Sequence, residues 1–390
     1  MTYFIHADKF FLENVTETGG YLEIDDNGNF GFYYSENKKP DGKIIDYVGK
    51  YVAPGLVDTH IHGLLNEDVM KSNWDGINKI SEGLLQAGVT SWVPTTITDS
   101  SDRLINICEK FAKHKGEETG AKILGLHFEG PYFTEKHAGA ENTKYMCDPS
   151  IDELYKFKAA SDNMLIKMSI APERKGAKEF VREAVKSGVI ISLGHSASNF
   201  ADAIACVEAG ASMFCHTYNG MEPMSQHSPN LLGAAFSARL VTDELICDGH
   251  HVLQPTIRAL IQAKGVEHIC LITDCMQAGM MPDGDYVLGE LPVYVEKGVA
   301  RLKTKGNSLA GSVLLLKQAV ENLVNWNIAT PEDAIMMASY VPAMSIGKLA
   351  QCGSIKPDKP ADFIVLNKDM TLCETYLNGV LRYKQKEQVN

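Results

Sequence analysis

Imidazole and carboxylate side chains recur at the ends of apolar runs in this 390-residue chain. The first run, LVDTHIHG (56–63), carries His60 and His62, and side chains two apart on a strand share a face. Both could therefore reach one ion, and imidazole and carboxylate are ligands that suit zinc or iron. Later runs carry further residues of these kinds at or near their ends: Glu129, His195, His216, His250, His251 and Asp274.

Each of these residues also has a simpler interpretation. A lone strand histidine is more often a hydrogen-bonded core residue, and His127 could be one that lies only behind the ligands. Such residues at five run ends, those of His60 and His62, Glu129, His195, His216 and Asp274, are harder to explain in that way. Glu129 also ends an apolar strand, where an unpaired charge is costly. Four histidines lack such a placement and are interpreted as solvent or loop residues: His6, His114, His137 and His268.

The segments that must position these residues alternate from residue 55 onward. Stretches such as NWDGINKISEGLLQAG and GAKEFVREAVKSG have helical spacing and end at glycine. About eight such β-α repeats over roughly 300 residues predict a (β/α)8 barrel, whose active sites form at the C-terminal strand ends. The predicted strand runs are 56–63, 89–96, 123–130, 166–173, 189–196, 213–220, 245–251 and 268–275.

Both ends of the chain differ from this middle part. Residues 1–54 hold short strand-like runs with turn signals between them, and the C-terminal segment returns to that pattern. We therefore expect an α/β fold with a TIM-like (β/α)8 barrel over residues 55–354. A small β-sandwich domain would be built from residues 1–54 plus 355–390.

Composition narrows the class of protein. A net charge of −12 argues against broad binding of nucleic acid or an anionic membrane, while a small anionic ligand needs only local donors. The chain has no apolar run long enough to span a bilayer, and its N-terminus does not resemble a signal peptide. Nine cysteines without zinc-ribbon spacing predict buried, reduced thiols and a cytoplasmic protein.

Six short motifs give the chain a family resemblance. Together with the HxH of the first run, they resemble the amidohydrolase superfamily and, within it, the N-acetylglucosamine-6-phosphate deacetylases. The resemblance extends along essentially the whole chain and includes PADFIVLN near the C-terminus. The motifs are HFEGPYF (127–133), SLGHS (192–196), HTYNGM (216–221), DGHH (248–251), ITDCMQAG (272–279) and LAGS (309–312).

The resemblance implies an activity in amino-sugar catabolism and a set of roles. The activity is hydrolysis of the acetamide of N-acetyl-D-glucosamine 6-phosphate to D-glucosamine 6-phosphate and acetate. Asp274 matches the catalytic acid–base residue. Glu129, His195 and His216 match the metal ligands, and His60 and His62 match a pair that some members use for a second ion, with Glu129 as the bridge. One or two zinc or iron ions per subunit are therefore expected.

The remaining matches concern the sugar phosphate, and two positions depart from the family pattern. His227, in SQHSPNLLG, stands where an arginine commonly binds the phosphate, often across a dimer interface; a homodimer sharing His227 is therefore expected. Glu141, in GAEN (139–142), stands where many members have histidine. Matches to sugar-phosphate or acetamide contacts are Ala140, Asn219, Gly220, His251, Leu309, Ala310 and Gly311.

Three alternatives stay open at this point. The substrate could be N-acetylgalactosamine 6-phosphate, or the chain could be a non-catalytic sugar-phosphate sensor on the same fold. A hydrolase that uses a carbamoylated lysine is a weaker alternative. That class needs a lysine at the end of the fourth strand, whereas Lys167 opens the fourth run here.

Overall fold

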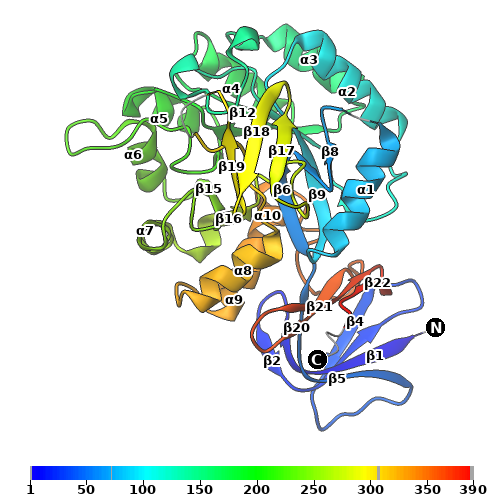
Figure 1. The fold of residues 1–390 in the computed structure, drawn as a ribbon. Coiled ribbons are helices and arrows are strands. Elements are labelled where there is room, and N and C mark those ends of the chain that lie inside the picture. The colour runs from blue at the N-terminus through cyan, green and yellow to red at the C-terminus, as the bar shows by residue number, and fades with distance from the viewer. Residues whose placement is uncertain (1, 72, 305–307, 387–390) are drawn as a thin grey trace.

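The computed structural model describes residues 2–71, 73–304 and 308–386. It confirms the α/β class, with a parallel barrel and a mixed sheet that both ends of the chain build (Figure 1). The outermost residues of the predicted small domain, residue 1 and residues 387–390, lie outside the described part. Within that part, no helix combines the length and the apolar character that crossing a bilayer requires.

The barrel has eight parallel strands that follow one another in chain order. β6 pairs with β9, and the later strands continue in sequence to β16. Their runs are apolar because a barrel strand is buried on both faces. The strands are β6 (Leu56–Ile61), β9 (Val89–Thr96), β11 (Leu126–Glu129), β12 (Leu165–Ile170), β13 (Ile190–Leu193), β14 (Met213–Phe214), β15 (Thr242–Ile246) and β16 (Ile269–Ile272).

The first and last barrel strands meet beyond the end of β16. The Asp274 N–H donates to the His60 carbonyl over 2.9 Å, and the His62 N–H donates to the Cys275 carbonyl over 2.8 Å. This closing seam joins segments that are more than 200 residues apart in the sequence. It therefore brings the HxH of β6 next to Asp274.

The predicted boundary of the seventh strand is wrong. The strand begins at Thr242, not at residue 245, because Asp243 and Glu244 belong to it and are fully buried. Glu244 forms an ion pair with Lys167, and Asp243 Oδ2 lies 3.5 Å from Lys264 Nζ. Partners of this kind make buried carboxylates tolerable in a strand, and they are invisible in the sequence.

Helices surround the barrel, as the helical spacing predicts (Figure 1). α1 begins after Asn73, whose side chain accepts from the Gly76 N–H and caps the helix. The ten helices of the described part are α1 (Trp74–Leu85), α2 (Ser101–Lys113), α3 (Ile151–Ala160), α4 (Ala177–Lys186), α5 (Phe200–Glu208), α6 (Asn230–Ser237), α7 (Gln254–Lys264), α8 (Leu316–Asn325), α9 (Pro331–Ala338) and α10 (Tyr340–Ser345). Three 3₁₀ turns accompany them: η1 (Glu135–His137), η2 (Thr143–Tyr145) and η3 (Val266–His268).

The small domain is a single mixed sheet that curls around its own core. β20 and β4 have β5, β1 and β3 between them, yet the rings of Phe363 and Phe30 lie only 6.2 Å apart. Curling in this way gives the sheet an enclosed apolar side, as a sandwich would. Its strands are β1 (Tyr3–Phe11), β2 (Thr16–Thr18), β3 (Tyr21–Ile24), β4 (Phe30–Tyr34), β5 (Lys43–Pro54), β20 (Phe363–Asn367), β21 (Leu372–Leu377) and β22 (Val380–Lys384).

Two short sheets lie outside the barrel ladder and the small domain, and one further short strand, β10, extends the barrel ladder. β17 (Gly284–Leu288), β18 (Leu291–Glu296) and β19 (Val299–Leu302) form an antiparallel sheet that follows β16. The sequence analysis did not predict this sheet. β7 (Gly63–Leu64) pairs with β8 (Glu67–Asp68), and β10 (Lys122–Ile123) precedes β11 and pairs with β9.

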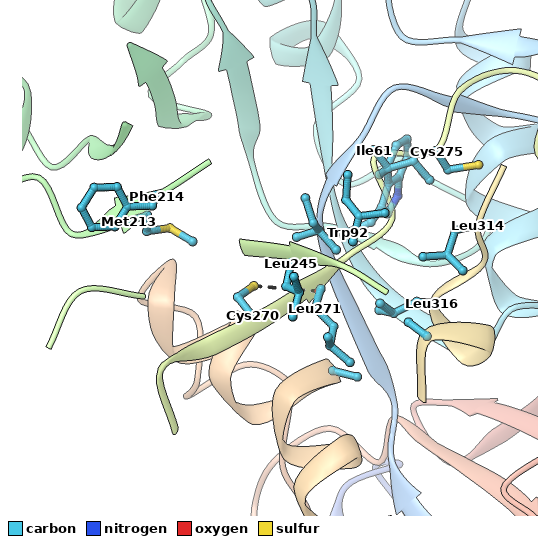
Figure 2. Packing of buried hydrophobic residues seen from close by; sticks show 14 of the residues in the cluster. Ile61, Trp92, Met213, Phe214, Leu245, Cys270, Leu271, Cys275, Leu314 and Leu316 are labelled. Atoms are coloured by element: carbon cyan, nitrogen blue, oxygen red, sulfur yellow. Dashed lines mark hydrogen bonds between the residues drawn. The ribbon is translucent and has the colours of Figure 1, made fainter. Parts of the chain in front are cut away.

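The main apolar core fills the barrel and the space between strands and helices. Figure 2 shows part of it, with Leu245 and Leu271 on neighbouring strands and Trp92 on β9. A second, smaller core lies inside the small domain. All nine cysteines are free and seven of them are buried, in agreement with the predicted reduced thiols.

One ion pair crosses the interior of the barrel. Lys167 on β12 and Glu244 on β15 are both fully buried, and the Lys167 ammonium also donates to the Thr59 carbonyl over 3.2 Å. Burial raises the pKa of Glu244, but the Lys167 charge and a hydrogen bond with His60 outweigh it and lower that pKa to about 2. Glu244 is therefore an anion whose partner is essential.

Removing one member of this pair is expected to destabilise the barrel. Lys167→Met leaves Glu244 charged and unpaired, which should lower the free energy of unfolding by about 3–5 kcal/mol in urea titrations. Lys115→Met is the matched control, because Lys115 pairs with Asp162 at the exposed surface and its loss should cost less than about 1 kcal/mol. Equal effects of the two substitutions would contradict this account.

Candidate metal centre and active site

A cavity of about 290 Å³ opens at the C-terminal ends of the barrel strands. Most residues that the sequence singles out are in its wall. Four are not: His60 is fully buried beneath the floor, Ala310 is fully buried behind its neighbours, His227 lies on an exposed loop, and His250 is exposed. The predicted residues that line the cavity are His62, Glu129, Ala140, His195, His216, Asn219, Gly220, His251, Asp274, Leu309 and Gly311.

The Glu129 carboxylate is the centre of the cavity floor, and its two oxygens face different pairs of histidines. Oε1 lies 3.1 Å from His195 Nε2 and 2.9 Å from His216 Nε2. Oε2 lies 3.4 Å from His60 Nε2 and 3.1 Å from His62 Nε2. One carboxylate can therefore serve two adjacent positions, as a bridging ligand does.

Asp274 belongs to the second of these positions. Its Oδ1 lies 3.0 Å from His62 Nε2 and 3.7 Å from His60 Nε2. Ligand atoms of Asp274, both of these histidines and Glu129 all lie within 4.8 Å of one another. Asp274 also lines the cavity, so it can meet both an ion and a substrate.

Hydrogen bonds on the far side of the rings decide which imidazole nitrogen faces the centre. Nδ1 of His195 donates to the His137 carbonyl over 2.8 Å, and Nδ1 of His216 donates to the Asn219 carbonyl over 3.1 Å. Nδ1 of His62 likewise points at the Thr95 carbonyl, 3.2 Å away. A carbonyl oxygen only accepts, so these bonds leave each Nε2 available as a ligand atom.

His60 completes the set. Its Nδ1 lies 3.3 Å from Glu244 Oε2, so the Lys167–Glu244 pair orients this ring from below. Its Nε2 is buried and makes no hydrogen bond to any residue that the structure describes. Four convergent imidazole nitrogens, one of them without a hydrogen bond, and two carboxylates are a donor set that fits one or two divalent cations.

The electrostatics of the protein agree with this fit. Burial lowers the pKa of His62, but Asp274 and Glu129 outweigh it and hold that pKa well above its usual range. Burial raises the pKa of Glu129, but the histidines outweigh it and hold that pKa well below its usual range. The site therefore attracts positive charge to its imidazoles, and a cation can take the place of those protons.

His127 is buried behind the ligands, as one alternative interpretation held. Its Nε2 is 2.8 Å from the Ser169 hydroxyl and its Nδ1 is 3.2 Å from the Thr95 hydroxyl. Burial and the charge of Lys167 hold the pKa of His127 well below its usual range. His127 therefore packs as a neutral ring beside His60, with ring centroids 4.7 Å apart.

Three residues that approach the centre leave the strand geometry. His195, His216 and Asp274 have positive φ values of 45°, 24° and 51°. Such angles are unusual outside glycine and cluster at functional sites. Nearby Gly220 has φ +61°, and a Cβ there would lie 2.9 Å from His195 Nδ1, so only glycine fits.

Several functional positions were missed by the sequence analysis. Leu288 of β17 and Ser308 line the cavity, but nothing in their local sequence marks them. His137 was interpreted as a loop residue, yet its carbonyl orients His195 and its ring lies 2.7 Å from Glu222. Glu244 could have been found, because a carboxylate in the middle of a buried strand needs a partner.

Glu141 was noted only as a departure from the family pattern. The structure places it in the cavity wall, 3% exposed, with its Oε2 accepting from the Thr98 N–H over 2.5 Å. Burial and the negative charge of Glu129 raise the pKa of Glu141 to about 8. A third carboxylate thus faces the same small cavity.

Lys167 does not occupy the position of a carbamoylated lysine. Its ammonium pairs with Glu244 below the ligands, and it does not line the cavity. A carbamate on this nitrogen would be an anion against the Glu244 carboxylate. The buried pair therefore argues further against that weaker alternative.

Comparisons with known proteins place this geometry in a family. The Amidohydrolase family model matches residues 51–383. The chain is 36% identical over 361 residues to the N-acetylglucosamine-6-phosphate deacetylase of Vibrio furnissii, covering 92% of this chain and 90% of that protein. It is also 36% identical over 331 residues to the N-acetylgalactosamine-6-phosphate deacetylase of Escherichia coli O157:H7, covering 85% and 87%.

A solved structure agrees over the whole length. It is an aspartate-to-alanine mutant of N-acetyl-D-glucosamine-6-phosphate deacetylase from Mycobacterium smegmatis, in complex with N-acetyl-D-glucosamine-6-phosphate. The two chains superpose with a TM-score of 0.92 at 27% identity, covering 98% of this chain and 100% of that one. By the family model, the relatives and the fold together, this chain belongs to the amidohydrolase family.

Proposed function

We propose that this protein hydrolyses the acetamide of N-acetyl-D-glucosamine 6-phosphate, giving D-glucosamine 6-phosphate and acetate. Amidohydrolases are metal-dependent, and the histidine and carboxylate cluster of this chain fits a metal. The observation that carries the proposal is the carboxylate of Asp274, which lines the cavity 3.0 Å from a metal-ligand nitrogen of His62. The relatives named above act on sugar phosphates of this kind.

The ligand set divides between two positions that share Glu129. His195 and His216 would hold one ion, and His60 and His62 a second, with zinc or iron as the expected metal. When bound, a divalent cation lowers the pKa of a water molecule and polarises the amide carbonyl. Two ions per subunit are proposed because both histidine pairs are present around one carboxylate that could bridge them.

Asp274 would move the proton. Burial raises its pKa, but a hydrogen bond from His62 and the charge of His60 outweigh it and keep that pKa below the usual value. It is therefore an anion that can accept a proton from the attacking water. It then donates that proton to the amine nitrogen as the C–N bond breaks, the double role of a positioned acid–base group.

The cavity wall supplies the contacts that would orient the sugar phosphate. Asn219, Gly220 and His251 offer polar groups, and Asp248 accepts from His251 Nδ1 over 2.6 Å, which fixes the ring. Ala140 and Leu309 offer apolar surface for the sugar and its acetyl methyl group. Ala310 lies behind Leu309 and Gly311 and would act through the backbone.

N-acetylgalactosamine 6-phosphate is a second candidate substrate, because a galactosamine-specific relative has the same 36% identity as the glucosamine-specific one. The two sugars differ only in the configuration of the hydroxyl at C4, whereas the reacting acetamide is on C2. An acetate-release assay with both sugars side by side tests the preference. Release from neither sugar would support a non-catalytic sensor instead.

We also propose a cytoplasmic homodimer in which His227 serves the partner's site. The loop that carries His227 is exposed from Pro223 to Pro229 and projects from the barrel beside α5 and α6 (Figure 1). His227 does not line the cavity of its own subunit. A donated imidazole would compensate for the absent phosphate arginine, and the nine free cysteines suit a reducing compartment.

Removing the carboxylate of Asp274 should stop the chemistry. Asp274→Asn is expected to lower the rate of acetate release by roughly 10²–10⁴-fold, the range for a lost acid–base group, while substrate still binds. Asp285→Asn, at an exposed position on β17, is the matched control and should keep full activity. Near-normal turnover in Asp274→Asn would assign the proton transfer to another residue.

Metal content should follow the two pairs of histidines. Fully loaded protein is expected to hold two equivalents of divalent metal by elemental analysis, and His60→Asn should lose about one of them. Chelation should abolish acetate release, and added zinc or iron should restore it. His250→Asn, at an exposed position, is the control for the loss of an imidazole. A wild-type protein that never binds more than one equivalent of metal would refute the proposal that Glu129 bridges two ions.

Sharing of His227 can be tested by mixing subunits. His227→Ala should raise KM with little change in kcat, and His227→Arg should lower KM, because guanidinium binds phosphate more strongly. Mixed dimers of His227→Ala and Asp274→Asn subunits contain one site with both residues intact. They should regain the wild-type KM, and a fully active monomer in sedimentation analysis would contradict sharing.

A further inference from the structure

Glu141 lies closer to the metal position than a residue that contacts only the sugar would need to be. The loop between η1 and η2 carries its carboxylate into the cavity. Ligand atoms of Glu141, Glu129 and His195 all lie within 4.8 Å of one another. The Glu141 side chain is therefore within reach of an ion at the position of His195 and His216.

The immediate surroundings of Glu141 do not balance its charge. Its hydrogen bonds come from Thr98, and it forms no ion pair with a lysine or arginine of the described residues. The neighbouring Glu129 carboxylate carries the same charge and repels it, and the charge of His62 opposes that repulsion. Two carboxylates so close in one buried cavity are both charged only with a cation near them, and otherwise one of them takes up a proton.

The arrangement of His195 and His216 around Glu129 is a second, independent observation that favours a cation at this position. His195 and His216 both use Nδ1 to donate to backbone carbonyls. Their Nε2 atoms are only 3.0 Å apart, and both point at Glu129 Oε1. Two imidazole nitrogens and a carboxylate oxygen at such distances need a proton or a metal cation among them, and a divalent cation can satisfy all three at once.

We infer that Glu141 is a fourth protein ligand for the divalent cation held by Glu129, His195 and His216. The inference rests on the proposed metal centre and deepens it, because it adds a ligand that the family resemblance does not supply. A second carboxylate makes this position richer in oxygen. It should therefore narrow the advantage of zinc over manganese or iron, compared with a site of one carboxylate and two histidines.

The test measures metal binding, not turnover. His60→Asn removes one ligand of the other position, so metal-free protein with this substitution is the background for titrations with Mn²⁺ and Zn²⁺. In that background, Glu141→Gln should weaken Mn²⁺ binding by more than about 10²-fold, beyond the roughly 10–100-fold range for residues that only orient a ligand. Glu290→Gln is the matched control, because Glu290 is exposed and bonds Asn142 of the same loop.

A second variant and a spectrum keep the test decisive. Glu141→His should retain Zn²⁺ affinity but lose part of the affinity for Mn²⁺, and Co²⁺-loaded Glu141→Gln should show changed visible absorption bands. Unchanged Mn²⁺ affinity and an unchanged Co²⁺ spectrum in Glu141→Gln would overturn the inference and leave the proposed function intact. A protein that binds none of these ions with Glu141 present would instead refute the proposed metal centre itself.

Discussion

The arrangement of the cavity floor depends on a single buried carboxylate, that of Glu129. A charge at the end of a barrel strand, almost without water, is tolerated only if positive charge surrounds it. Four imidazole rings surround the Glu129 carboxylate, two near each oxygen. Backbone carbonyls fix the orientation of three of these rings. This arrangement of rings around Glu129 depends on the strand ends and on the loops that provide the carbonyls. It also depends on the residues with positive φ, His195, His216 and Asp274.

A second layer of charge supports the first from inside the barrel. Lys167 neutralises Glu244, Glu244 faces Nδ1 of His60, and His60 faces Glu129. Positive and negative groups thus alternate from the core to the cavity floor. This series of charged groups orients His60, and none of Lys167, Glu244 and His60 is exposed to solvent. It also explains why a barrel strand contains Glu244, a residue that simple rules of burial would exclude.

The sequence predicts the architecture well, because apolar runs, helical spacing and turn signals are local properties. It also predicts which side chains meet, since His60, Glu129, His195, His216 and Asp274 all follow from their places at strand ends. It could not predict β17–β19, whose Leu288 lines the cavity, or the carbonyls that orient the rings. Those features depend on contacts between distant segments, which no local pattern records.

The closing seam of the barrel links the fold to the chemistry in one more way. The last strand reaches the first beyond its own end, through a few backbone hydrogen bonds, and those bonds lie beside Asp274 and the His60–His62 pair. Local opening of a protein begins where such bonds are few. Heating that parts this seam would separate Asp274 from His60 and His62 before the rest of the barrel unfolds. A tightly bound substrate or metal would delay that loss of the site by holding the two strands together.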